Sequence, residues 1–329
     1  MQIERRTGRG RGPLQGAVVA AAVALVVSGC DGAKVGSTTA ATGGSAGKGC
    51  PTFNLAVNNW VGYEANAAVI AYLAENKLGC KVVRKNLDEQ VSWQGFGTGE
   101  VDAVVENWGH EDLLKKYVTE QKVATDLGPT GNIGKIGWYI PPWLAKAHPD
   151  ITSWKTLNTY APMFRTSESG GKGQLLDGDP GFVTNDAALV ENLKLNDKVV
   201  YSGSEAALIT TFRQAEKNKK PVIGYFYEPQ WFLAEVPLVK VNLPTYKPGC
   251  DANAAKVACD YPLYKLNKVV STRFASSGSP AYALVKKFRW TNADQNLVAK
   301  YIAQDKLSAE AAAKKWVQAN PDKVKAWLS

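Results

Sequence analysis

The sequence contains few histidines and lacks the short motifs that mark several enzyme classes. Only two histidines occur among the 329 residues, and His110 is not followed by a second histidine at the spacing of the zinc-hydrolase motif HExxH. No GxxxxGKS or GxxxxGKT phosphate loop occurs, and no two of the five cysteines form a CxxC pair. These absences argue against a zinc hydrolase, a P-loop nucleotidase and a structural zinc site. We therefore expect no catalytic residue, no metal and no cofactor.

The N-terminus has the pattern of an export signal. Four arginines precede an apolar run over residues 17–27, and the small residues Ser28 and Gly29 lead to Cys30. This pattern resembles a bacterial lipoprotein signal, which implies that residues 1–29 are removed and that Cys30 carries lipid. Because the run is shorter than the roughly 20 residues that span a bilayer, an ordinary cleaved signal or a helical anchor is the alternative. We expect a protein held by lipid on the extracytoplasmic face of the cell membrane.

The segment that follows Cys30 is expected to be a flexible tether. Residues 30–49 are mostly Gly, Ala, Ser and Thr and contain no aromatic residue, so they have little apolar surface to bury. Removing residues 1–29 takes away four arginines and one glutamate and lowers the formal charge from +9 to +6. The remaining basic residues are scattered along the chain, so we expect no nucleic-acid partner.

The four cysteines that remain after Cys30 suggest disulfides formed outside the cytoplasm. An even number of cysteines in an exported chain allows three pairings of four. Cys50 and Cys80 each flank a predicted strand, whereas Cys250 and Cys259 share one polar loop. We favour the pairs Cys50 with Cys80 and Cys250 with Cys259.

The rest of the chain has the alternating pattern of an α/β protein, and about 280 residues fit two lobes better than one small core. Strands are expected over residues 53–59, 80–86, 101–107, 135–140, 198–203 and 221–227, and helices over 64–76 and 204–218. After the loop with Cys250 and Cys259 the chain is expected to be almost entirely helical, over 280–288, 294–304, 308–318 and 322–327. These late helices are expected to pack on the first lobe.

Aromatic residues gather where the predicted strands end. Trp60 and Trp108 each follow a strand directly and lie among polar loop residues. In open α/β sheets, ligands bind outside the carboxyl ends of the strands, so both indoles are expected at a cleft. By contrast, four other tryptophans occupy helical positions and are expected in the core: Trp154, Trp290, Trp316 and Trp327. An exposed indole face in a cleft favours a flat or cationic ligand.

Four motifs carry a resemblance that runs from about residue 52 to the C-terminus. They are NNWVGYEAN (58–66), WQGFGTGEVDAVVENWGHED (93–112), GKIGWYIPPWL (134–144) and GYFYEPQW (224–231). In this order they resemble the substrate-binding proteins of glycine betaine, proline betaine and choline ABC importers. The resemblance implies a two-lobed type II periplasmic-binding fold that closes over a trimethylammonium group held by aromatic rings. We expect the lobes to comprise residues 50–135, 136–242 and, returning to the first lobe, 243–329.

The resemblance also implies roles for individual residues. Trp60 and Trp108 match the family's first-lobe cage tryptophans, and Trp138 or Tyr139 matches a ring from the second lobe. The late motif departs from the family pattern at Glu228, where relatives typically have threonine. Tyr227 is a candidate for the last wall of the cage, and Glu228 either pairs with the cation or begins a helix.

A betaine ligand also carries a carboxylate, which needs hydrogen-bond donors. Asn185, which precedes a predicted helix, and the backbone amides of Val61 and Gly62 are candidates, because helix starts have unpaired N–H groups. His110 either donates to the ligand or stabilises its own loop.

We expect a monomer that binds without chemistry and delivers its ligand to a membrane permease. A cell-surface sensor with the same cage, or the same fold binding another small solute, is the alternative. A secreted glycosidase is a remote one, since Asp102, Glu106 and Glu111 are explained equally well by strand ends and a helix start.

Overall fold

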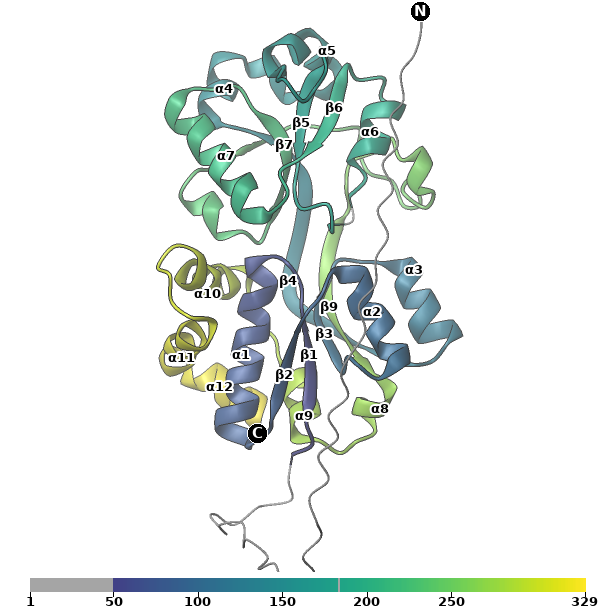
Figure 1. The fold of residues 1–329 in the computed structure, drawn as a ribbon, viewed down its shortest axis with the longest axis vertical. Coiled ribbons are helices and arrows are strands. Elements are labelled where there is room, and N and C mark those ends of the chain that lie inside the picture. Colours follow the sequence, from purple (N-terminus) through teal and green to yellow (C-terminus); the bar gives the residue numbers. More distant parts are fainter. Residues whose placement is uncertain (1–49, 183) are drawn as a thin grey trace, which may run out of the picture. The chain divides into compact units, whose positions relative to one another are not determined.

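The computed structural model describes residues 50–182 and 184–329. The predicted signal, the predicted lipidation site Cys30 and the predicted tether over 30–49 lie outside these residues. Within the described part, no helix is both long enough and apolar enough to cross a membrane. The expectation of an α/β fold with two lobes is confirmed, and Figure 1 shows the two groups of helices, each around its own part of one mixed sheet.

The first lobe is built around three short parallel strands. β1 (Phe53–Val57) pairs with β2 (Val82–Asn86) on one side and with β3 (Ala103–Asn107) on the other. All five positions of β3 are buried, which fits a strand covered by helices on both faces. Between the strands run α1 (Val61–Leu78) and α2 (Glu89–Thr98).

Two long strands continue the sheet from one lobe into the other. β4 (Ala124–Ile140) pairs antiparallel with β9 (Leu263–Ser271) over its first part and with β7 (Ile223–Glu228) over its second. The full order is β2-β1-β3-β9-β4-β7-β5-β6, with β8 (Val239–Lys240) beside β4. Figure 1 shows β4 and β9 running between the lobes.

The second lobe contains the parallel strands β5 (Gly173–Asp177), β6 (Asp197–Tyr201) and β7. Its regular helices are α4 (Pro142–Ala147), α5 (Leu157–Tyr160), α6 (Asp186–Asn192) and α7 (Glu205–Asn218), joined by the short helices η2 (Pro149–Thr152), η3 (Trp154–Thr156), η4 (Ala161–Phe164) and η5 (Trp231–Ala234).

The C-terminal helices return to the first lobe, where three of them pack against α1 and the last packs against its helical neighbours. They are α9 (Pro280–Lys287), α10 (Asn292–Ala303), α11 (Ala309–Ala319) and α12 (Pro321–Leu328). Trp290, Trp316 and Trp327 are buried among them, with the Trp316 and Trp327 rings stacked at 5.6 Å. Smaller helical segments are α3 (Glu111–Leu113), η1 (Leu114–Glu120), η6 (Ala254–Lys256) and α8 (Thr272–Ala275).

The sheet differs from the sequence-based expectation at several points, and the strands β5 and β8 were not predicted at all. The strand predicted over 135–140 begins at Ala124, and the chain after the Cys250–Cys259 loop is not entirely helical because it first forms β9. The early part of β4 contains Gly128, Pro129 and Gly131, with the two glycines at positive φ and register shifts against β9. Such residues read as turns, and only pairing with β9 makes this segment a strand.

Both predicted disulfides are confirmed. Cys50 is bonded to Cys80, and Cys250 is bonded to Cys259. The first ties the start of β1 to the start of β2, and the second closes a loop between β8 and β9.

The lobe limits at residues 135 and 242 stay a prediction. Residue 135 lies inside β4. The segment after residue 242 makes contacts with second-lobe elements, since Asn192 of α6 donates to the carbonyls of Ala255 and Val257, and Lys240 pairs with Asp260 at 2.7 Å.

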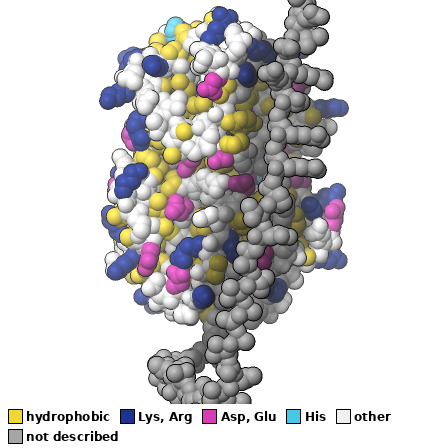
Figure 2. All heavy atoms as spheres, viewed as in Figure 1, with side chains coloured by type: hydrophobic (Ala, Val, Ile, Leu, Met, Phe, Trp, Pro, Cys, Tyr) yellow, Lys and Arg dark blue, Asp and Glu magenta, His cyan; other side chains and the backbone are white. Residues whose placement is uncertain are grey.

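Charge is mixed over the described surface. On the face in Figure 2, Lys and Arg side chains are spread over many positions and alternate with Asp and Glu. This face has no continuous basic stripe of the kind that tracks a nucleic-acid backbone.

Candidate functional site

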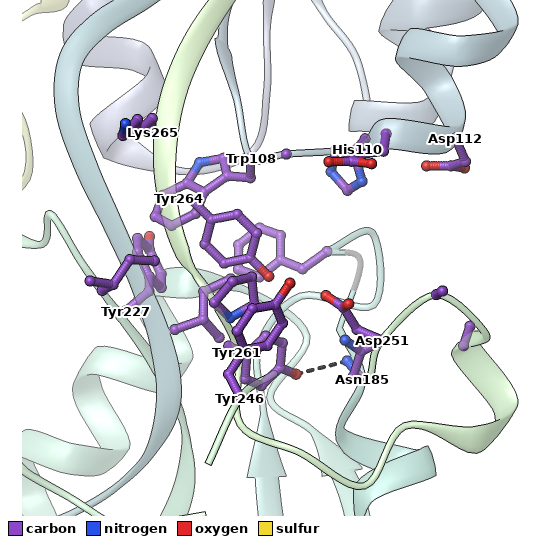
Figure 3. Close-up of a pocket in the computed structure, with 18 of the residues that line it drawn as sticks. Trp108, His110, Asp112, Asn185, Tyr227, Tyr246, Asp251, Tyr261, Tyr264 and Lys265 are labelled. Carbon is purple, nitrogen blue, oxygen red and sulfur yellow. Dashed lines mark hydrogen bonds between the residues drawn. The ribbon is translucent and has the colours of Figure 1, made fainter. Parts of the chain in front are cut away.

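A cavity of about 960 Å³ lies between residues of the two lobes. Aromatic side chains form much of its wall, and Figure 3 shows Trp108 of the first lobe facing Tyr227 and Tyr261 across it. The aromatic lining consists of Trp60, Trp108, Phe182, Tyr225, Tyr227, Tyr246, Tyr261 and Tyr264. The volume is in the range of small-molecule sites.

The strand ends position these rings. Trp60 follows β1 and Trp108 follows β3, two neighbouring parallel strands whose carboxyl ends meet at one edge. In β7, Tyr225 and Tyr227 alternate with Phe226, so both tyrosines point to the cavity while Phe226 faces Tyr139 and Phe212 on the other side.

The rings pack edge to face rather than in flat stacks. Trp108 meets Tyr227 with centroids 5.7 Å apart at 87°, and Trp60 meets Phe182 at 5.7 Å and 88°. Both contacts join a first-lobe ring to a second-lobe ring. Such T-shaped pairs are favourable for aromatic quadrupoles and leave ring faces free for a ligand.

Glu106, in β3, holds both cavity tryptophans, Trp60 and Trp108. Its Oε1 accepts hydrogen bonds from the indole N–H groups of Trp60 and Trp108, at 2.8 Å each. Its Oε2 accepts from Asn66 Nδ2 and, at 2.9 Å, from Gln295 Nε2. The carboxyl is 1% exposed, and this burial raises its pKa to about 7 despite the four donors.

A second buried carboxylate, Glu205, begins α7 and reaches across to the first lobe. Its Oε1 accepts from the Tyr227 hydroxyl and from Gln230 Nε2, the latter at 2.6 Å, and its Oε2 accepts from the backbone N–H of Val61 at 2.9 Å. Val61 is the first residue of α1, whose N-cap Trp60 supplies no side-chain cap. Burial raises the pKa of Glu205.

Asp186, at the start of α6, holds a fourth ring of the cavity, that of Tyr261. Its Oδ1 accepts from the Tyr261 hydroxyl at 2.6 Å and from the Trp138 indole at 2.8 Å. Burial, and then the nearby charge of Asp177, raise the pKa of Asp186 to about 8. The Tyr261 hydroxyl in turn accepts the backbone N–H of Asn185 at 2.7 Å, a bond seen in Figure 3.

The non-aromatic lining carries mostly negative charge. Four acidic residues, Glu89, Glu111, Asp112 and Asp251, lie in the wall with one lysine, Lys265. His110 Nε2 is 2.7 Å from Glu89 Oε1, outside good hydrogen-bond geometry. Burial is the largest single effect and lowers the pKa of His110, but the charge and close contact of Glu89 and the charge of Asp112 together leave the pKa above its ordinary value.

Five of the residues predicted from the sequence line this cavity, and they come from both lobes. They are Trp60, Trp108, His110, Asn185 and Tyr227.

The other predicted residues lie elsewhere. Trp138 is 1% exposed and donates to Asp186 behind the wall, and Tyr139, one residue on, faces the opposite side of the sheet against Phe226. The Val61 amide is bonded to Glu205, and Gly62 lies against Gln295.

Glu228 ends β7 and does not begin a helix, since the next helical turn starts at Trp231. Its carboxylate is half-exposed and 3.6 Å from Lys135 Nζ, beside a smaller cavity.

Several lining residues were not found from the sequence. Tyr225 was detectable, because it has the same alternation in β7 as Tyr227. Phe182, Tyr246, Tyr261 and Tyr264 lie in loops or in β9, and nothing local in the sequence marks them as neighbours of Trp108.

The comparisons with known proteins identify the family of this chain. Residues 51–319 match the family model OpuAC, the substrate-binding domain of ABC-type glycine betaine transport systems. The chain belongs to this family. It is therefore a substrate-binding protein of an ABC transporter for betaine-like compounds, a class of solute-binding proteins that act outside the cytoplasm and are not enzymes.

Curated relatives in the family have named ligands. The trimethylamine N-oxide-binding protein of Pelagibacter ubique is 28% identical over 288 residues, which cover 81% of this chain and 87% of the relative. The glycine betaine/carnitine transport binding protein of Listeria monocytogenes is 25% identical over 154 residues, 46% of this chain and 47% of the relative.

Solved structures share the fold. Lactococcal OpuAC in its closed form with glycine betaine has a TM-score of 0.66 at 22% identity, covering 85% of this chain and all of that one. A choline-binding protein in complex with choline has a TM-score of 0.68 at 18% identity, covering 84% of this chain and 91% of that one.

Proposed function

We propose that this binding protein captures a trimethylammonium compound in the cavity between its lobes and delivers it to a membrane permease. The observation that carries the proposal is the set of ring walls from both lobes, Trp60 and Trp108 on one side and Tyr225 and Tyr227 on the other. A methylated ammonium has no N–H to donate, so ring faces are its natural contacts.

The acidic lining supports a cationic headgroup. The wall favours positive charge in the cavity, because it contains four acidic residues and only one lysine, Lys265. The acidic residues are Glu89, Glu111, Asp112 and Asp251. A good ring contact with a desolvated cation contributes about 2 kcal/mol, so the loss of one ring should weaken binding by more than tenfold.

Candidate ligands are glycine betaine, proline betaine, choline and trimethylamine N-oxide. Glycine betaine follows from the family, choline from a structural neighbour and trimethylamine N-oxide from the Pelagibacter relative, whereas proline betaine follows from the resemblance of the four sequence motifs. All share the methylated nitrogen and differ in the group attached to it.

Lobe closure is part of the proposed mechanism. Rings from both lobes must approach the ligand together, and the closed form is the one that docks on the permease. Small-angle scattering should show compaction at saturating ligand, and an unchanged radius of gyration would contradict closure.

We further propose that the protein acts as a monomer anchored through lipid on Cys30, which keeps it close to the permease. Replacing Cys30 with serine should move the protein from the membrane fraction into the medium. Retention in the membrane would mean that residues 17–27 act as a helical anchor instead.

The proposal is tested by calorimetric titration with the four candidate ligands. At least one should bind with micromolar affinity, and Trp108→Ala should weaken it tenfold or more. Trp154→Ala is the matched control, since Trp154 is half-buried in η3, outside the cavity lining. If no trimethylammonium compound binds, or if both variants weaken binding equally, the proposed cage is wrong.

A further inference from the structure

Four of the cavity rings donate hydrogen bonds through their polar ends to three buried carboxylates. These are Glu106, Glu205 and Asp186, which accept hydrogen bonds from Trp60 and Trp108, from Tyr227, and from Tyr261, respectively. None of the three carboxylates is itself in the cavity lining.

The carboxylates have no positive partner nearby. Among residues 50–182 and 184–329, none of the three forms an ion pair with Lys, Arg or His. They are 1%, 8% and 0% exposed for Glu106, Glu205 and Asp186. An unpaired buried carboxylate is costly, and a cation held in front of the rings is the charge that would offset it.

The same carboxylates occupy the donors that a ligand carboxylate would need. The N–H of Val61, an unpaired donor of the first turn of α1, is taken by Glu205 Oε2 at 2.9 Å. The indole N–H groups of Trp60 and Trp108 are both taken by Glu106. A ligand with its own carboxylate would find these three donors already used and would meet the like charge of a lining with four acidic residues and one lysine.

We propose that Glu106, Glu205 and Asp186 are specificity-determining residues that select trimethylammonium ligands without a carboxylate. This inference rests on the proposed function, because it concerns the same cavity. It predicts that choline and other compounds without a carboxylate bind more tightly than betaines. Glu205 is the decisive residue, because it lies in the second lobe and accepts the backbone N–H of Val61 in the first.

Choline and glycine betaine make a matched pair for the test, since they share the headgroup and differ by a hydroxymethyl group against a carboxylate. The full chain, titrated at pH 8.5, should bind choline at least tenfold more tightly than glycine betaine. Equal or tighter binding of glycine betaine would overturn the inference. If the chain binds none of choline, glycine betaine, tetramethylammonium and trimethylamine N-oxide, the proposed function is refuted. This inference then fails with it.

Charge-neutral variants then locate the effect. Glu205→Gln keeps the shape and should lower the choline-to-betaine affinity ratio at least fivefold, by weakening choline while leaving betaine unchanged or tighter. Glu75→Gln is the control, since it removes the same charge from a surface pair with Arg84. If Glu205→Gln does not fold, Glu106→Gln serves in its place. An equal ratio in the carboxylate variant and in the control would overturn the inference.

Discussion

Substituting Glu106 with glutamine should remove a defined part of the pH dependence of folding stability. Burial raises the pKa of this carboxyl from 4.5 to about 7 in the folded protein. The folded state therefore binds the proton more tightly than the unfolded chain. The stabilisation that comes from this tighter proton binding is complete below pH about 4.5 and is lost as the pH rises through about 7.

The magnitude follows from the gap between the two pKa values. A difference of roughly 2.5 pH units, at about 1.4 kcal/mol for each, corresponds to about 3 kcal/mol. Glutamine at this position stays neutral at every pH. The free energy of unfolding of the variant therefore lacks this part of its dependence on pH. Its new amide N–H group has acceptors available, because Asn66 Oδ1 and Gln295 Oε1 are buried without hydrogen-bond partners.

Urea unfolding at pH 5 and pH 8 measures the effect. Between these values the native protein should lose about 2.5 kcal/mol more of its free energy of unfolding than Glu106→Gln does, because part of the full effect lies below pH 5. Other buried carboxyls, such as Asp186, contribute to both proteins and cancel in the comparison. Glu75→Gln, on the surface, should keep the native slope. If the free energy of unfolding changes equally with pH in the native protein and in Glu106→Gln, the raised pKa assigned to Glu106 is refuted.

Two more predictions concern the walls of the cavity. A Cβ added at Gly134 would lie 2.5 Å from Trp108 Cζ3, so Gly134→Ala should displace the indole, cost about 1–3 kcal/mol of stability and weaken ligand binding at least tenfold. Gly97→Ala, in α2 with open space at its Cβ, should leave binding unchanged, and normal binding by Gly134→Ala would contradict the placement of Trp108. Replacing both Cys250 and Cys259 with serine opens a disulfide of sequence separation 9, which should cost about 2.6 kcal/mol by chain entropy. The same change at Cys50 and Cys80, with separation 30, should cost about 3.6 kcal/mol. Only the loss of the Cys250–Cys259 disulfide should also weaken ligand binding at 25 °C, because several residues between 246 and 264 line the cavity. Calorimetry of both double variants tests this.

The elements with strong local patterns were predictable. α1 and α7 were expected over 64–76 and 204–218 and occupy Val61–Leu78 and Glu205–Asn218. β9 was missed, since its polar first residues alternate with apolar ones only weakly and its partner β4 contains turn-forming glycines. Strand pairing between distant segments has no local signal.

The candidate site shows the same division. Trp60 and Trp108 were recognisable because each directly follows a strand, and the ends of parallel strands share one edge of the sheet. Trp138 and Tyr139 were expected in the cage as well, but the structure places them outside its lining, because one is held by Asp186 and the other faces away.

The sequence by itself determined the α/β class and the placement of Trp60 and Trp108 at a strand edge, because periodicity and strand ends are local properties, whereas it only favoured one of three possible disulfide pairings. Only the tertiary structure decided which rings complete the cavity and which carboxylates stand behind them. Glu106, Glu205 and Asp186 come from three segments far apart in the chain, and their partners are brought to them by the packing of the two lobes. The sequence does not show which acidic residues are buried, because burial depends on hydrogen-bond donors that come from other parts of the chain.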